Sequence, residues 1–136
     1  MKQSLLVNEA KSMLDQAYVP YSTFPVGAAL LTKDGKVYKG CNIENAAYPV
    51  TCCAERVAIF KAVSEGERDF ESLAVIANTS RPVPPCGACR QVMSEFFDPE
   101  MNVYISNKDL EVKEVKVKEL LPFSFNQDDL SSGQEK

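Results

Sequence analysis

The stretch Pro84-Pro85-Cys86-Gly87-Ala88-Cys89-Arg90-Gln91, residues 84–91, follows a short apolar run from Leu73 to Ala77. A run of that length that is apolar almost throughout is typical of a strand buried on both faces. The prolines end this strand, and the segment from Cys86 to Phe97 is typical of a helix. The sequence therefore predicts a central strand that leads into a helix with two cysteines in its first turn.

A second helix is predicted on the N-terminal side of this unit, from Cys53 to Glu65. Its apolar residues fall on helical faces, and Gly66 provides a plausible stop. Earlier still, two apolar segments flank a turn whose Asp-Gly pair supplies the positive φ of a hairpin. The expected strands of this hairpin are Phe24 to Thr32 and Lys36 to Ile43.

The two ends of the chain complete the expected fold. Ser4 should cap a helix over about residues 4 to 18, which Pro20 stops. Two further strands, Met101 to Ser106 and Glu111 to Val117, are joined by a link too short for a crossover, so they should be antiparallel. At most a short helix fits before Pro122. We expect an α/β fold with three layers, α/β/α, around a mixed five-stranded sheet whose last strand is antiparallel.

Length and composition limit the class of protein. A chain of 136 residues is expected to form one domain over residues 1–136, with a polar tail over about residues 126 to 136 that frays. The net charge of -4 and the scattered basic residues argue against a nucleic-acid polymer as partner. No run is apolar enough to span a bilayer and no signal-peptide core is present, so we expect no membrane contact and a cytoplasmic location.

Five cysteines without regular spacing indicate reduced thiols with a metal or catalytic role, and the absence of histidine means that a zinc site must rest on thiolates. Cys86 and Cys89 alone fit zinc binding and a thioredoxin-like dithiol about equally well, with buried apolar thiols as a less common alternative. Adding Cys53 favours zinc, because three protein ligands leave a position open to water, as in catalytic sites. Cys41 and Cys52 are interpreted as packed thiols, although Cys52 is an alternative fourth ligand.

Two charged residues follow Cys53 at short range. Glu55 is close enough for its carboxylate to reach a zinc-bound water and carry its proton, although an acidic residue in a first helical turn is common without any such role. Three thiolates on one zinc ion leave a formal charge of about -1 by simple addition. Arg56, one turn from Cys53, is a candidate to offset it by hydrogen bonding to sulfur, with a solvated helix charge as an equally weighted alternative.

These residues match a known signature. Zinc-dependent nucleobase deaminases have a histidine or cysteine ligand, a glutamate two residues later and a distant Pro-Cys-x-x-Cys. The corresponding residues are Cys53-Ala54-Glu55 and Pro85-Cys86-Gly87-Ala88-Cys89. Two longer blocks, residues 20–29 and 40–48, also resemble those of the small homotetrameric cytidine deaminases. The resemblance covers roughly residues 5 to 125.

The resemblance implies a function and a set of roles. The expected reaction is hydrolysis of cytidine and deoxycytidine to uridine and deoxyuridine in pyrimidine salvage, with one zinc ion per chain and release of ammonia. Glu55 would carry protons from the attacking water to the pyrimidine. The implied substrate contacts are Phe24, Asn42, Glu44 and Ala54, together with Phe125, which would reach the active site of a neighbouring subunit.

Other functions stay open at this point. A deaminase of another aminated heterocycle, such as a nucleoside antibiotic, would keep the zinc site and change the ribose contacts. A thiol oxidoreductase would use Cys86 and Cys89 as a dithiol, and a non-catalytic zinc module would not need Glu55.

Overall fold

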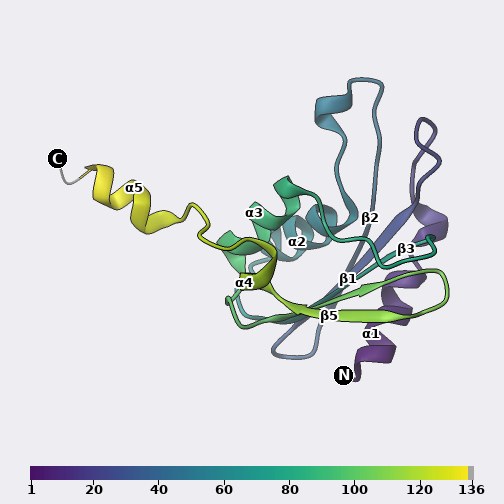
Figure 1. Cartoon of the computed structure of the whole chain (residues 1–136), viewed down its shortest axis with the longest axis horizontal. Coiled ribbons are helices and arrows are strands. Elements are labelled where there is room, and N and C mark those ends of the chain that lie inside the picture. The colour runs from purple at the N-terminus through teal and green to yellow at the C-terminus, as the bar shows by residue number, and fades with distance from the viewer. Residues whose placement is uncertain (135–136) are drawn as a thin grey trace.

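A five-stranded sheet forms the middle layer of the protein, whose computed structural model describes residues 1–134 (Figure 1). The strand order is β2-β1-β3-β4-β5, and β3 and β4 are the parallel pair. The last pair, β4 and β5, is antiparallel, which confirms the expectation drawn from their short link. The strands are β1 Val26–Thr32, β2 Val37–Cys41, β3 Phe70–Ala77, β4 Asn102–Ser106 and β5 Val112–Lys116.

Helices cover both faces of the sheet, so the three-layer α/β/α fold is confirmed (Figure 1). On one face α1 packs against β1 and β3, and on the other face lie α2 and α3. The helices are α1 Gln3–Lys11, α2 Ala54–Ser64, α3 Gly87–Phe96, α4 Val117–Leu120 and α5 Gln127–Gln134. Among the described residues, no helix has both the length and the apolar character that crossing a membrane requires.

The two cores follow from the alternation of side chains along β1. Ala28 and Leu30 face the core formed with α2 and α3, whereas Ala29 and Leu31 face the core formed with α1. All four side chains are buried. A strand that is buried on both faces has apolar residues at nearly every position, and the sequence therefore predicted the central strands.

The first helix is shorter than predicted, and its cap was assigned wrongly. Helix α1 begins after Lys2, which makes no capping hydrogen bond through its side chain, and it ends at Lys11. A short 3-10 turn over Leu14–Gln16 follows. The chain then becomes extended, because Tyr18 pairs with the segment after β2: its N–H donates to Asn42 O at 3.0 Å, and its carbonyl accepts from Glu44 N at 2.9 Å. This tertiary pairing overrides the helical spacing of the apolar residues.

Helices α2 and α3 each begin one residue later than predicted. Cys53 and Cys86 are the N-cap residues of α2 and α3 and have extended backbones, so they precede the first turns instead of lying within them. Strand β3 begins at Phe70, three residues before the predicted Leu73. Shifts of this size are expected, because helix and strand ends depend on local hydrogen bonds.

Within the polar tail, residues 127–134 form helix α5, which the sequence did not predict, and residues 135–136 lie outside the described part of the chain. Asn126 caps this helix: its side-chain oxygen accepts from Asp128 N at 2.9 Å, and Asp129 accepts from Asn126 N at 2.9 Å. Such a reciprocal cap, with two acidic residues in the first turn, stabilises a helix start. Figure 1 shows α5 extending away from the sheet.

Helix α2 lies directly on β2 because Gly40 has no side chain. A Cβ at this position would lie 2.5 Å from Ala54 O and 2.6 Å from Ala58 N. Both atoms belong to backbone, which cannot give way as a flexible side chain can. Helix α2, which begins directly after Cys53, is therefore held at a distance from the sheet that only glycine permits.

We predict that Gly40→Ala lowers the free energy of unfolding by about 3 kcal/mol, because the added methyl group forces α2 away from β2. Denaturant unfolding of the zinc-loaded protein measures the change. Gly87→Ala is the matched control, since a Cβ there meets no atom within 4 Å. A loss of stability in the control as large as that in Gly40→Ala would contradict the steric explanation.

Candidate metal centre and active site

Three cysteine sulfur atoms meet where α2 and α3 begin. The Sγ atoms of Cys53, Cys86 and Cys89 all lie within 4.8 Å of one another. Cys53 Sγ is 3.7 Å from Cys86 Sγ, which is 3.4 Å from Cys89 Sγ. The two N-caps and the first turn of α3 supply these side chains, so the structure brings together the three cysteines that the sequence singled out.

The spacing of the sulfur atoms fits a zinc ion. Zn–S bonds of about 2.3 Å at tetrahedral angles place two sulfur atoms about 3.8 Å apart. The observed 3.7 and 3.4 Å need only small side-chain adjustments to reach this value. The cluster therefore fits one zinc ion per chain with a fourth position free for another ligand, while Cys41 and Cys52 lie outside it.

Hydrogen bonding shifts the pKa values of two of these thiols, Cys53 and Cys89, in opposite directions. The hydrogen bond from Cys89, together with one from Arg56, lowers the pKa of Cys53 to about 5. The same hydrogen bond to Cys53, with burial, raises the pKa of Cys89. Cys53 thus loses its proton before Cys89 does. Because zinc binds thiolates, these cysteines would hold the ion in their deprotonated form.

Glu55 is the buried acidic group beside this cluster. It lies in the first turn of α2, is 4% exposed and lines the same cavity as Cys53 and Cys86. Burial raises its pKa to about 7, because a charged carboxylate loses its solvation there. A carboxyl group of this kind beside a metal site is suited to accepting and returning a proton.

Arg56 approaches the cluster from the next position in α2. Its Nη2 lies 3.4 Å from Cys53 Sγ and 3.4 Å from Thr51 O. Its Nε is buried and has no hydrogen-bond partner among the described residues. The guanidinium is thus held against a metal-ligating sulfur instead of being a solvated helix charge.

The cavity next to the cluster has a volume of about 350 Å³ and collects most of the predicted substrate residues. Phe24, Asn42, Glu44 and Ala54 all line it. Asn42 Oδ1 accepts from Val26 N at 2.9 Å, and its Nδ2 donates to Phe24 O at 2.8 Å. These contacts hold the segment before β1 against the end of β2, a structural role for Asn42 that the sequence did not suggest.

Glu44 also supports this loop. Its carboxylate accepts from Tyr21 N at 3.0 Å, from Ser22 N at 3.1 Å and from the Ser22 hydroxyl. The Ser22 hydroxyl and these backbone groups hold the pKa of Glu44 below its usual range. Ser22 also lines the cavity, and it was overlooked because a loop serine carries no sequence signal of its own.

The apolar side of the cavity was likewise not predicted. Residues from the end of β3 and from the loop before α3 form it, namely Val75, Ala77, Val83, Pro84 and Pro85. The sequence places these residues in a strand and in the proline-rich segment that ends it, and it does not indicate that they line a cavity. Their position beside the thiol cluster depends on β3 and β4 being parallel, with the loop after β3 returning over the sheet.

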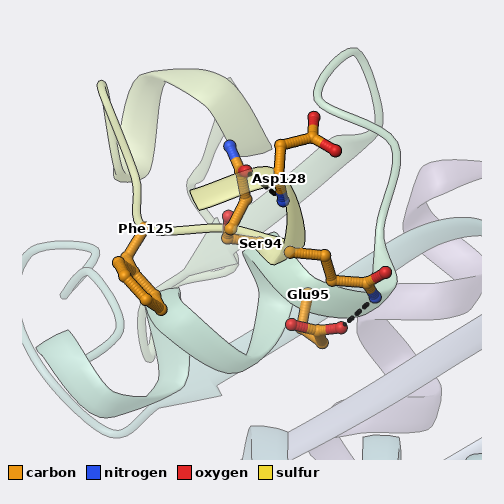
Figure 2. Close-up of a pocket in the computed structure, with 6 residues that line it drawn as sticks. Ser94, Glu95, Phe125 and Asp128 are labelled. Atoms are coloured by element: carbon orange, nitrogen blue, oxygen red, sulfur yellow. Dashed lines mark hydrogen bonds between the residues drawn. The ribbon is translucent and has the colours of Figure 1, made fainter. Parts of the chain in front are cut away.

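Phe125 does not line this cavity. It follows α4, is 58% exposed and lines a separate depression between α3 and α5, where Ser94 and Glu95 also lie (Figure 2). Glu95 accepts a hydrogen bond from Gln127 Nε2 at 2.6 Å at this junction. The structure of one chain therefore leaves Phe125 outside the metal centre of that chain.

Comparison with known proteins identifies the class. The family described as "Cytidine and deoxycytidylate deaminase zinc-binding region" matches residues 1–105. A cytidine deaminase of Sporosarcina psychrophila is 58% identical over 93% of each chain, and one of Halalkalibacterium halodurans is 54% identical over 96% of this chain and 99% of its own. The solved cytidine deaminase of Burkholderia pseudomallei superposes with a TM-score of 0.90 at 46% identity, over 92% of this chain and 100% of its own.

The fold and the three-thiol cluster thus define a zinc-binding hydrolytic enzyme. The chain belongs to the cytidine and deoxycytidylate deaminase family. Because the chain belongs to a zinc-binding family, Cys86 and Cys89 are explained by zinc binding. A thioredoxin-like dithiol is not supported.

We predict that Cys53→Ala, Cys86→Ala and Cys89→Ala each lose tightly bound zinc, because two remaining thiolates hold the ion too weakly. Metal analysis after dialysis, expressed per chain, measures this. Cys52→Ala is the control, since Cys52 lies outside the cluster and should leave zinc at one per chain. Loss of zinc from the control would make Cys52 a fourth ligand and would close the open position.

Proposed function

We propose that this protein is a zinc-dependent cytidine deaminase that hydrolyses free cytidine and deoxycytidine to uridine and deoxyuridine and releases ammonia. The observation that carries the proposal is the buried Glu55 carboxylate, which faces the same cavity as the cysteine cluster. Relatives that are 58% and 54% identical are cytidine deaminases, and they support the same substrate class. The negative net charge agrees with a free nucleoside as substrate in preference to a nucleic-acid polymer.

Glu55 moves the protons in the proposed mechanism. Zinc, when bound, supplies the Lewis acidity that makes water a nucleophile near neutral pH. Glu55 accepts the proton of the attacking water and delivers it to ring nitrogen 3 as the new oxygen bond forms at carbon 4. It then takes the proton of the new hydroxyl group at carbon 4 and passes it to the departing amino group, so that the carbon–oxygen double bond forms as the carbon–nitrogen bond breaks and neutral ammonia leaves. Burial suits the carboxylate to both directions of transfer, because it raises the proton affinity.

Asn42 and Glu44 are proposed to bind the ribose hydroxyls, and their existing contacts leave room for this. Asn42 uses one of its two amide N–H groups for Phe24 O, and Glu44 uses three of the roughly four acceptor sites of a carboxylate. A diol therefore meets one free donor and one free acceptor, each already oriented by the loop. Phe24 and Ala54 supply cavity surface for the base.

Arg56 is proposed to offset the charge of the three thiolates. A tri-thiolate zinc centre carries a formal charge of about -1, which weakens the metal as a Lewis acid. The hydrogen bond from Arg56 Nη2 to Cys53 Sγ draws electron density from sulfur, and the buried position of Nε limits competition by solvent.

The proposed assembly is a homotetramer in which Phe125 reaches a neighbouring active site. Support comes from large apolar side chains that are mostly exposed in the single chain, including Phe123, Phe125, Tyr48 and Val50. We also infer that residues 1–136 form one catalytic domain. A cytoplasmic location stays a prediction, and it rests on the five free thiols, which a reducing compartment preserves.

The test of the function compares the zinc-loaded protein with Glu55→Gln. We predict that the wild-type chain converts cytidine to uridine, followed by ultraviolet absorbance, whereas Glu55→Gln is slower by about 10³-fold or more because no group carries the proton. Metal analysis on the same samples should give one zinc per chain for both proteins. A substrate panel that includes deoxycytidine and an aminated nucleoside antibiotic separates the proposed activity from its nearest alternative.

Two results would contradict this proposal. Failure of the fully zinc-loaded wild-type chain to deaminate cytidine would remove the substrate assignment. Unchanged turnover by Glu55→Gln with zinc retained would instead remove Glu55 from the mechanism and leave the metal centre intact.

For the assembly, we predict that sedimentation or light scattering gives the mass of four chains, since burying the exposed aromatic groups favours association. Phe125→Ala should raise KM for cytidine in the tetramer, because a neighbouring active site loses its aromatic contact. A monomeric, fully active protein would exclude any shared active site.

A further inference from the structure

Helix α3 holds the segment that carries Phe125. We name residues 121–126, between α4 and α5, the aromatic arm. Three side chains on one face of α3 bind the arm or the residue before it: Arg90 Nη1 donates to Leu120 O at 2.9 Å, Gln91 Nε2 donates to Phe125 O at 3.0 Å, and Ser94 Oγ donates to Ser124 Oγ at 2.8 Å. These contacts form a row along the helix, and one of them is made to the backbone of Phe125 itself.

Packing does little to determine the course of this arm. Phe123 is fully exposed and Phe125 is 58% exposed, so neither ring is anchored in the core. Phe123 has a φ of 52°, in the left-handed region that residues with a side chain rarely adopt. Because neither burial nor local backbone preference accounts for the path, the hydrogen bonds from α3 are the interactions that set it.

Arg90 connects the arm with the metal centre. It directly follows Cys89, and its Nε donates to Pro85 O at 2.8 Å, the carbonyl just before Cys86. One guanidinium therefore bonds the loop that carries a metal-ligating sulfur and, through Leu120 O, the base of the arm. Arginine can do this because its N–H groups form a rigid planar fork, whereas lysine presents one compact ammonium.

We propose that Arg90 and Gln91 are positioning residues that fix Phe125 relative to the metal centre, so that helix α3 carries the cysteine ligands and the aromatic arm as one unit. The inference rests on the proposed function in that Phe125 is taken to contact substrate in a neighbouring subunit. In that assembly, one helix would set both the metal site of its own chain and the aromatic contact offered to another. Neither residue touches the reacting atoms, so both act through the groups they hold.

The chain contains no tryptophan, so Phe125→Trp introduces a single indole that reports the position of the arm. In that background, Arg90→Lys and Gln91→Leu should shift the indole emission to longer wavelength and lower its anisotropy. Arg90→Lys weakens the contact at Leu120, just before the arm, and Gln91→Leu removes the hydrogen bond to Phe125 itself. Arg68→Lys is the matched control. Arg68 also donates to two backbone carbonyls, Val63 O at 2.9 Å and Glu67 O at 2.7 Å, but it does so at the far end of α2.

Kinetics in the native Phe125 background give a second measure. Gln91→Leu should raise KM for cytidine by about threefold to tenfold, the effect expected for one hydrogen bond, with kcat nearly unchanged and zinc retained. Once Phe125→Ala is present, Gln91→Leu should raise KM no further, because the two residues act through the same contact.

The results of these experiments distinguish a failure of the positioning role from a failure of the proposed function. Emission and anisotropy that stay unchanged in both Arg90→Lys and Gln91→Leu, or that shift equally in Arg68→Lys, would overturn the positioning role. An unchanged KM in Phe125→Ala would instead remove Phe125 from the active site, and the indole emission would then decide the positioning role alone.

Discussion

Two helix N-termini meet beside the sheet, and the convergence of their first residues is the constraint on which the rest of the structure depends. Cys53 ends the loop before α2, and Cys86 ends the loop before α3, so the sulfur atoms are fixed by two N-caps instead of by a flexible loop. The close contact of α2 with β2 at Gly40 sets one helix, and the parallel pairing of β3 with β4 sets the return of the other. A shift of either helix separates the three sulfur atoms.

A zinc site held by thiolates alone carries excess negative charge, and a cationic side chain lies beside it. With no histidine in the chain, three thiolates must hold the zinc, and their combined charge exceeds that of the ion. Arg56 contacts the sulfur of Cys53, whose pKa hydrogen bonding already lowers. Glu55, one residue earlier, is buried and keeps a high proton affinity. The N-cap and first turn of α2 thus bring together a cysteine of the cluster, a buried carboxyl group and a guanidinium, which are proposed to act as ligand, proton carrier and counter-charge.

Two polar residues of the cavity also combine a structural role with a proposed role in ligand binding. Asn42 and Glu44 hold the loop over residues 20–26 and also line the cavity, where they are proposed to bind the ribose hydroxyls. A binding group that is already held by the fold loses little conformational freedom when a ligand arrives, so preorganisation favours affinity. Substitution of either residue is therefore expected to disturb the loop and the ligand contact together.

Local spacing was enough to predict the element types, the antiparallel last strand and the three cysteines that the structure brings together, because periodicity and short motifs depend on neighbouring residues. The catalytic role of Glu55 stays a prediction. It misjudged the end of α1, where pairing of Tyr18 with residues 42–44 overrides helical spacing, and the tail, where the cap by Asn126 was overlooked. Only the tertiary structure decided which loop residues enclose the cavity, that Arg56 meets a sulfur, and that α3 binds the aromatic arm. The cavity loops and the aromatic arm join residues far apart in the chain, so no local pattern encodes them. Arg56 lies only one helical turn from Cys53, and the structure selected one of the two alternatives that the sequence left open.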